Sequence, residues 1–318
     1  MMKTMQHWTP VSVRLSYRLG EIGLFHKNFS GLANREHFSK VEPRVGVPNL
    51  ENCLDASPSF VYFPTYPVRS APPPIVIRDG WIVYTPYTFK NYYIDFERLG
   101  SFDNYLQSAF SSKSRSTLQR KVRKFAEADG GEVHWRQFSR AAEIDEFFAQ
   151  AHAISARTYQ ERLLDAGLPT SAEYIAQAKE MVEAGRALCY ILYLKGEPVA
   201  YLLCFCQDGI ASYDFLGYDP AAQALSPGTV LHYFVLQSLF ESKAVRIFDF
   251  TEGEGTHKAF FGSDHRLCAK TYFFRRTLLN RTLVHAHYGL NRSVEAIGAL
   301  LERHGLKGRI KRFIRKVS

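Results

Sequence analysis

The hydrophobic pattern of the chain changes its period from one region to the next. Across residues 102–184 apolar residues recur at helical spacing, which predicts helices over 102–128, 141–164 and 171–184. From residue 187 onward short apolar runs take over and predict three strands, at 187–193, 198–206 and 210–216. A Lys-Gly-Glu turn at 195–197 joins the first two strands, so we expect the three to form an antiparallel meander.

The third strand opens a strand–helix–strand unit. It ends in Gly217-Tyr218-Asp219-Pro220, and a polar loop then leads to an apolar helix, Val230–Phe240, and to a further apolar strand, Val245–Phe250. Such units place ligands at the carboxyl ends of their strands, so we expect a binding site near the loop Thr251–Lys258. A last alternating strand is predicted at 269–275, and a helical segment at 282–318.

The N-terminal third of the chain is less regular. Residues 1–60 mix short apolar pieces with Gly and Pro and show no clear period. A hairpin is predicted where Asp79-Gly80 separates the β-rich runs 75–77 and 81–84. Residues 91–96 predict a further strand or a short edge.

The start of the helix after residue 226 has features of an anion site. Proline suits the first helical position, and the amides of Gly228, Thr229 and Val230 would point out of the helix without partners. Gly228 also lacks a side chain, so a ligand could approach the backbone. The alternative is that Ser226 is an ordinary N-cap residue followed by proline.

Positive charge is concentrated in two segments. Six of the 40 Lys and Arg residues lie within 307–316, which contains no acid, so much of the net charge of +9 sits there. Six more lie within 113–124, on a helix whose apolar face carries Leu118, Val122 and Phe125. Because the charge does not cover a face of the whole fold, the sequence argues against a dedicated nucleic-acid binder.

Each basic segment allows two interpretations. The helix at 113–124 is either a solvated face or a docking surface for phosphates on a cofactor or an acidic carrier. The amphipathic segment 307–318 either lies on an anionic membrane surface or docks on the body of the protein as a terminal helix.

Composition narrows the class of protein. The 318 residues suggest one large or two modest domains, and no apolar run is long enough to span a membrane. The first 18 residues do not form a secretory signal, so we expect a cytoplasmic protein, with peripheral binding at the inner membrane face as one option. The five cysteines and eleven histidines show no metal-binding spacing, and we predict reduced thiols and no metal site.

Several short motifs occur in an order that resembles one family. The motifs are Gly196-Glu197-Pro198-Val199-Ala200, Gly217-Tyr218-Asp219-Pro220, Ser226-Pro227-Gly228, Asp249-Phe250 and the segment Gly253–Lys258. With the predicted element order, they resemble the GNAT superfamily of acyltransferases, in its FemAB/CelD-like branch with a BioF2-like acetyltransferase domain. The resemblance covers roughly residues 113–275. It implies an α/β (α+β) fold with a mixed, mostly antiparallel sheet flanked by helices, and the N-terminal extension could form a second, partial GNAT-like half.

The resemblance also implies a donor site. GNAT proteins hold the pyrophosphate of coenzyme A with a Gln/Arg-x-x-Gly-x-Gly/Ala turn, and Gln223-Ala224-Leu225-Ser226-Pro227-Gly228 occupies that place here. Ser226 replaces the first glycine of the pattern. The expected donor-binding residues are Gln223, Ser226, Gly228, Thr229 and Val230. The departure leaves room for a longer acyl-CoA or an acyl carrier as co-substrate, with no tightly bound cofactor.

The implied reaction is direct attack of an amine on a thioester. It needs a base, hydrogen-bond donors for the oxyanion and a proton for the thiolate. A backbone amide of 214–216 would meet the thioester oxygen. The candidate catalytic residues are Asp214, Glu252, Glu254 and His257 as bases, Lys258 as a partner of a carboxylate, and Tyr272 as proton donor. Four residues of the site have a structural alternative: Asp214 could pair with a cation, Asp249 could cap a turn, and His257 and Lys258 could be surface residues.

These expectations lead to a predicted organisation and function. We predict an N-terminal subdomain at 1–110, the acyltransferase domain at 111–278 and a basic helical tail at 279–318. The predicted activity is N-acyl transfer from an acyl-CoA or acyl-carrier thioester to an amine of a sugar, lipid or amino acid. Two alternatives stay open: a Fem-like transferase that uses aminoacyl-tRNA on a cell-envelope precursor, and a non-catalytic scaffold at a membrane.

Overall fold

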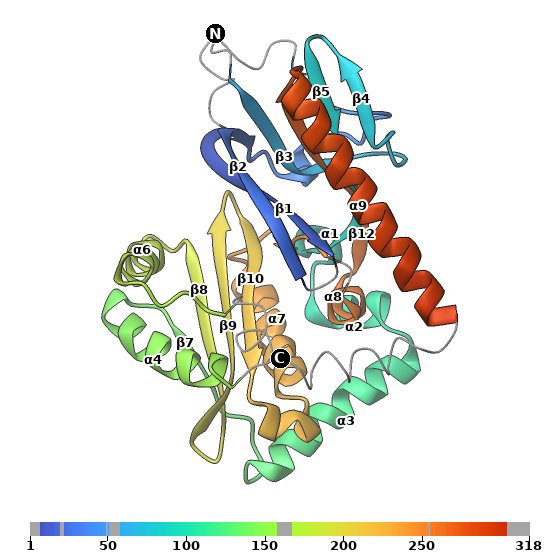
Figure 1. The fold of residues 1–318 in the computed structure, drawn as a ribbon. Coiled ribbons are helices and arrows are strands. Elements are labelled where there is room, and N and C mark those ends of the chain that lie inside the picture. The colour runs from blue at the N-terminus through green and yellow to red at the C-terminus, as the bar shows by residue number, and fades with distance from the viewer. Residues whose placement is uncertain are drawn as a thin grey trace. The chain divides into compact units, whose positions relative to one another are not determined.

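The chain folds into two compact units, each with its own hydrophobic core. The computed structural model describes residues 7–19, 22–48, 50, 58–157, 167–253 and 255–303. Unit 1 combines residues 1–90 with 266–318, and unit 2 is the continuous segment 91–265 (Figure 1). The domain boundaries predicted at 110 and 278 do not coincide with this division, because the helices that follow residue 95 pack within unit 2.

Unit 2 is built on a mostly antiparallel sheet with strand order β6-β11-β10-β9-β8-β7. Its strands are β6 (Thr88–Asp95), β7 (Trp135–Phe138), β8 (Ala187–Leu194), β9 (Glu197–Gln207), β10 (Ile210–Tyr218) and β11 (Ile247–Asp249). β8, β9 and β10 form the predicted antiparallel meander. β10 and β11 are parallel, as predicted for the strand–helix–strand unit.

Helices cover both faces of this sheet. They are α1 (Phe96–Leu99), α2 (Phe102–Ala109), α3 (Ser112–Ala128), α4 (Ile144–Ser155), α6 (Ala172–Glu183), α7 (Pro227–Ser242) and α8 (Thr256–Phe261), with 3-10 turns η2 (Ala141–Glu143) and η3 (Pro220–Leu225). Alternate residues of β8 point to opposite faces: Tyr190 packs toward α7 and Ile191 toward α4. α7 therefore lies on one side of β8, β9 and β10, and α4 and α6 lie on the other (Figure 1).

The strands of unit 1 pair in the order β1-β2-β3-β12-β5-β4. Its elements are β1 (Trp8–Leu19), β2 (Ile22–Asn34), the 3-10 turn η1 (Phe38–Lys40), β3 (Phe60–Pro67), β4 (Ile75–Arg78), β5 (Trp81–Tyr84), β12 (Asp264–Arg275) and α9 (Leu278–Arg303). The predicted hairpin is present as β4 and β5. Asp79 and Gly80 have φ values of 50° and 76°, which a two-residue turn of this kind requires.

The structure differs from the predicted elements in two places, and a third predicted segment is not described. The irregular N-terminal region contains the long hairpin of β1 and β2, whose twelve and thirteen residues the mixed composition did not indicate. The predicted loop at 251–258 contains the first turn of α8, which begins at Thr256. The basic segment 307–318 lies outside the described residues.

Candidate active site

Strands β10 and β11 separate soon after they meet. They pair only through Ile210–Ser212 and Ile247–Asp249. β10 then continues to Tyr218 with β9 as its partner on the other side. Within the described residues, no strand pairs with the β11-facing edge of β10 beyond Ser212, so this edge can present backbone amides and carbonyls to a ligand.

A β-bulge lies in β10 where this edge opens. The register with β9 shifts between Tyr213 and Phe215, which makes Asp214 the extra residue. The bulge also moves the alternation of side chains by one position: Tyr213 and Leu216 both pack on the α7 side, whereas Phe215 packs on the α4 side. The backbone predicted to meet a thioester oxygen, 214–216, is therefore the bulged segment itself.

Asp214 is the extra residue of this bulge. Its carboxylate accepts a hydrogen bond from the Phe205 amide at 2.9 Å, and its charge acts on Tyr174 of α6. Desolvation by the surrounding chain raises the pKa of Asp214 to about 6, the Phe205 hydrogen bond opposes this rise, and the charge of Asp249 adds to it. Part of Asp214 is still exposed, so solvent screening limits the effect.

Asp219 fixes the turn between β10 and α7. Its carboxylate accepts a hydrogen bond from the Ala221 amide at 2.9 Å and pairs with the Arg157 guanidinium at 2.5 Å. Burial would raise the pKa of Asp219, but these two hydrogen bonds outweigh it and keep the pKa below its ordinary value. Ser226 ends the turn in the left-handed region, with φ 55° and ψ 49°, and its side chain makes no capping hydrogen bond. Ser226 is therefore not an ordinary N-cap residue.

The start of α7 offers fewer amides than predicted. Thr229 and Val230 donate to the Ser226 carbonyl at 3.0 and 3.1 Å, so the prediction that both amides are unpartnered is wrong. The reason is that the left-handed Ser226 turns its carbonyl into the first helical turn. No hydrogen bond within the described residues uses the Gly228 amide.

Gly228 has a packing role in this turn. A Cβ atom there would lie 3.3 Å from Leu216 Cδ2 and 3.4 Å from Tyr218 Cδ1. The absent side chain thus lets α7 lie close against β10, which is a different use from the predicted approach of a ligand.

α3 places positive charge beside the same turn. Lys124 Nζ donates to the Ala224 carbonyl at 3.1 Å, next to Gln223, which is exposed. Lys121, one helical turn earlier, is close enough to lower the pKa of His257. The basic face of α3 therefore extends from the turn before α7 to α8, and Lys124 supplies charge where two of the predicted amides are already used.

The loop after β11 begins with a buried carboxylate. Asp249 is 6% exposed and accepts hydrogen bonds from Asn91 Nδ2 at 2.6 Å and from the Thr251 amide at 2.8 Å. It thus caps the following turn, which was the structural alternative for this residue. Thr251 has a φ of 59°, and its hydroxyl donates to the Tyr213 carbonyl at 3.3 Å, so it ties the loop to β10 beside the bulge.

Lys258 holds the rest of this loop from inside. Its Nζ donates to the Glu252 carbonyl at 2.6 Å and to the Thr251 carbonyl at 3.5 Å, and it lies 6.0 Å from the centre of the Tyr213 ring. Burial lowers the pKa of Lys258, while the charges of Asp249 and Glu252 oppose that change. The ammonium group therefore fixes the loop against β10 through backbone carbonyls.

Two histidines meet beneath the loop. His257 Nε2 and both ring nitrogens of His232 are buried, and none has a hydrogen-bond partner within the described residues. The ring centres lie 5.1 Å apart at an angle of 85°. Burial lowers the pKa of His232 well below its usual range; burial, followed by the charges of Lys121 and Lys258, lowers that of His257 to about 4. Both rings are therefore neutral at pH 7.

The structure brings most of the predicted catalytic residues together. Asp214, Glu252, His257 and Lys258 all lie in unit 2, around the bulge of β10 and the loop after β11. Glu254 lies outside the described residues. Tyr272 lies in β12 of unit 1, stacked on Tyr62 at 5.0 Å, and its role as proton donor stays a prediction.

Several residues of this site were missed by the sequence analysis. They are Asn91, Tyr213, His232 and Thr251. His232 had a visible signal, because it is a polar residue inside the apolar helix predicted at 230–240. The contacts of the others depend on elements far away in the sequence, so no local pattern marks them.

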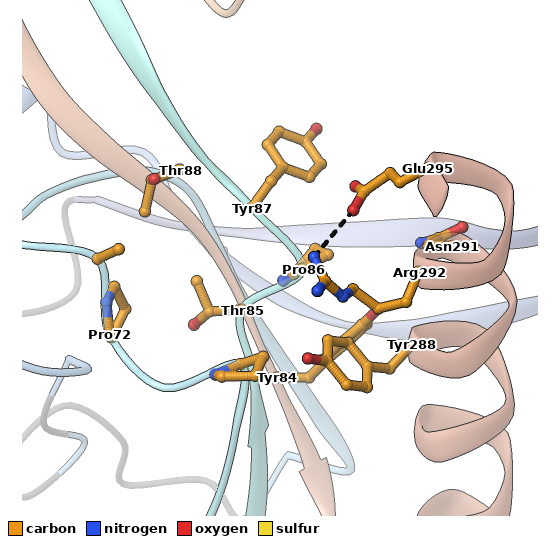
Figure 2. A pocket seen from close by; sticks show the side chains of 12 residues that line it. Pro72, Tyr84, Thr85, Pro86, Tyr87, Thr88, Tyr288, Asn291, Arg292 and Glu295 are labelled. Carbon is orange, nitrogen blue, oxygen red and sulfur yellow. Dashed lines mark hydrogen bonds and ion pairs between the residues drawn. The ribbon is translucent and has the colours of Figure 1, made fainter. Parts of the chain in front are cut away.

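A separate pocket lies within unit 1. It has a volume of about 250 Å³ and is lined by Tyr84, Tyr87 and Tyr288, by Arg292 and Glu295 on α9, and by the proline-rich segment before β4 (Figure 2). At its base the Tyr84 hydroxyl and His287 Nδ1 are 2.7 Å apart, so they already satisfy each other. None of the predicted catalytic residues lines it.

The described residues include neither a cluster of metal-ligating side chains nor a helix able to span a membrane. No group of His, Cys, Asp or Glu side chains there could hold a metal ion. None of the described helices combines the length and the hydropathy that crossing a membrane requires.

Comparison with known proteins identifies the domain. Residues 112–259 match the family model of the acetyltransferase (GNAT) domain, whereas no curated protein matches the chain. Solved structures similar to this chain have low sequence identity to it. FemX is 10% identical, with 86% of this chain and 90% of that chain covered and a TM-score of 0.48. L-PGS from Bacillus licheniformis is 16% identical, with 72% of each chain covered and a TM-score of 0.43.

A third structure belongs to the same group of matches. The C-terminal domain of a putative lysylphosphatidylglycerol synthetase from Agrobacterium fabrum is 10% identical, with 66% of this chain and 65% of that chain covered and a TM-score of 0.45. This chain thus spans slightly less than two thirds of that domain's length. The match to the family model confirms the predicted fold and enzyme class: the chain carries a GNAT-type acyltransferase domain.

Proposed function

We propose that the protein is an N-acyltransferase that moves an acyl group from a thioester to an amine by direct attack. The observation that carries this proposal is the separation of β10 from β11 at the bulge of Asp214. An open strand edge at this place can pair with the extended arm of a pantetheine thioester, as one strand pairs with another. The donor is an acyl-CoA or an acyl carrier, held without a tightly bound cofactor.

The diphosphate of such a donor would bind at the start of α7. The Gly228 amide, the positive end of the helix dipole and the Lys124 ammonium all carry partial or full positive charge there. Gln223, Ser226, Thr229 and Val230 complete the proposed donor turn, although the last two contribute through the helix dipole, since their amides are already used.

The proposed reaction proceeds in one step at the bulge. The amine nitrogen attacks the acyl carbon, the C–S bond breaks, and the thiolate leaves with the bonding electrons. A backbone amide from 214–216 donates to the developing oxyanion. A deprotonated side chain, either a carboxylate or a neutral imidazole, accepts the amine proton; Asp214, Glu252 and His257 are the candidates in the described residues, with Glu254 outside them. Tyr272 stays a candidate for returning a proton to the thiolate.

A second donor class is favoured by one specific observation. The basic face of α3, with Lys121 and Lys124, adjoins the proposed donor turn, and a ribose-phosphate chain would be attracted to it. An aminoacyl-tRNA donor, with a cell-envelope precursor as acceptor, is therefore the alternative. In the first case the acceptor is an amine of a sugar, a lipid or an amino acid.

Thiol release tests the proposed function. Purified protein is given acyl-CoAs of different chain length with amino sugars, amino lipids and amino acids, and free thiol is measured. We expect amine-dependent release, lost in a Gly228→Trp variant whose ring would fill the proposed donor turn. An exposed change away from the turn, such as Glu241→Gln, should keep it. If no pair of substrates releases thiol but RNase-sensitive transfer from aminoacyl-tRNA is found, the donor is aminoacyl-tRNA and not a thioester. The absence of both activities would reject the proposal.

The basic segment 307–318 has its own test. Its residues lie outside the described part of the chain, and we propose that they bring the enzyme to an anionic membrane surface. Cosedimentation with vesicles that contain phosphatidylglycerol should fall when residues 307–318 are removed. Equal binding by both proteins would remove the membrane from this proposal.

A further inference from the structure

The histidine pair beneath the loop after β11 is costly for the fold. His232 is fully buried in α7, and neither of its nitrogens has a partner in the described residues. Its neighbours are the rings of Tyr213, Phe248, Phe250, Phe261 and His257. A buried polar group without a hydrogen bond is destabilising, and unpaired groups in native structures are concentrated where a function needs them.

His257 is the one polar neighbour that can relieve this cost. Its Nε2 is buried and also unpartnered, and its ring lies 5.1 Å from that of His232, almost perpendicular to it. The second torsion of a histidine side chain is soft, so a modest ring rotation can bring two nitrogens into hydrogen-bonding range. The environment of these three unpartnered nitrogens is otherwise aromatic. A rotation of the His257 ring would therefore form one hydrogen bond between the two histidines.

The second ring nitrogen of His257, Nδ1, is accessible, unlike Nε2. Nδ1 has no protein partner among the described residues and is not buried, so it is the ring atom that solvent or a substrate can reach. His257 stands at the second position of α8, between the loop held by Lys258 and the ring of Tyr213, which directly precedes the bulge. A base at this nitrogen would therefore lie near the proposed reaction.

We propose that His232 is a positioning residue for His257. Its neutral imidazole accepts a hydrogen bond from the Nε2–H of His257 and so holds the tautomer whose Nδ1 lone pair is free. This inference rests on the proposed function for its catalytic meaning. In that reaction the amine proton passes to His257 Nδ1 while the C–N bond forms and the C–S bond breaks. Nε2–H stays bonded to His232, and the proton on Nδ1 later leaves to solvent.

The tautomer can be tested without any donor or acceptor. Full-length protein labelled with ¹⁵N-histidine gives ring nitrogen shifts that separate the two neutral tautomers, and a His257→Gln variant assigns its signals. We expect Nε2–H in the wild type and a mixture of tautomers in His232→Phe. His232→Gln keeps an acceptor oxygen and should retain Nε2–H. His285→Gln, an exposed change in α9, is the control and should alter no His257 signal.

The outcomes separate the two proposals. An Nδ1–H tautomer for His257, or a tautomer unchanged in His232→Phe, would overturn the inference whatever the enzyme's activity. Where thiol release is measurable, His232→Phe should lower kcat about 10- to 100-fold with little change in the KM for the donor, and His232→Gln should restore most of the loss. A correct tautomer pattern without thiol release would leave the pair intact and reject the proposed reaction instead.

Discussion

Replacing His232 by phenylalanine should change how the stability of unit 2 depends on pH. The folded protein keeps His232 neutral because the ring is fully buried, whereas an unfolded histidine has a pKa near 6.5. The unfolded state therefore binds more protons than the folded state below that value, and stability falls as the pH falls. For one histidine that stays neutral when folded, linkage gives a loss of about 2 kcal/mol between pH 7 and pH 5.

The variant should lack this loss. At pH 7 it removes the buried ring nitrogens of His232, worth about 1–3 kcal/mol for each that is unpaired, but it leaves Nε2 of His257 without the proposed partner and must fit a slightly larger ring, which cost about 1–3 kcal/mol each. We therefore expect His232→Phe and the wild type to have similar stability at pH 7. Relative to the wild type, the variant should gain about 2 kcal/mol at pH 5. His257 and Asp214 also titrate in this range, with opposite effects on stability, but they are common to both proteins and cancel in the difference.

Urea denaturation followed by circular dichroism at pH 7, 6 and 5 measures this difference. His285→Gln is the matched control, because it removes an exposed histidine and should keep the wild-type pH dependence. If the difference between wild type and His232→Phe is the same at all three pH values, His232 is not held neutral in the folded state, and the reasoning fails.

Three other changes test separate parts of the structure. Gly217→Ala should destabilise the protein by about 1–3 kcal/mol in urea denaturation, because the new Cβ would lie 2.3 Å from the buried Tyr201 ring. Gly289→Ala is the control: its Cβ on α9 would meet nothing within 4 Å, so it should stabilise the protein by about 1 kcal/mol. Equal effects of the two changes would contradict the packing around Gly217. Lys124→Glu should weaken coenzyme A binding about 10-fold at low salt and less at high salt, measured by calorimetry; a loss independent of salt would argue against phosphate contact. If Asp214 is the base, activity should fall as the pH drops through about 6, and Asp214→Asn should be inactive at every pH; a wild-type profile without this inflection would exclude the role.

Local patterns predicted the elements around the site well. The meander of β8, β9 and β10 and the helix after Pro227 follow from short apolar runs and from turn residues with few conformational options. The parallel pairing of β10 and β11 also follows, because a crossover helix joins them. Sequence order and turn chemistry therefore located the region of the candidate site.

The interior of the site could not be predicted in the same way. The left-handed conformation of Ser226 uses the Thr229 and Val230 amides, and nothing in the residues 223–228 indicated it. The three-residue pairing of β10 with β11 depends on the contacts of both strands with the rest of the sheet. The neighbours of His232 come from α7, β11 and α8, so its unpaired state appears only after these elements pack.

The division of the chain has a consequence for its synthesis. Unit 2 is one continuous segment, so it can fold as soon as it has left the ribosome. Unit 1 must wait, since its central strand β12 pairs with β3 and β5 and reaches them only after the whole intervening segment has been made. The buried contact of Thr85 with Thr271 joins residues 186 positions apart. Until then the edges of β3 and β5 lack this partner, which makes the nascent N-terminal strands the part of the protein that most needs a chaperone.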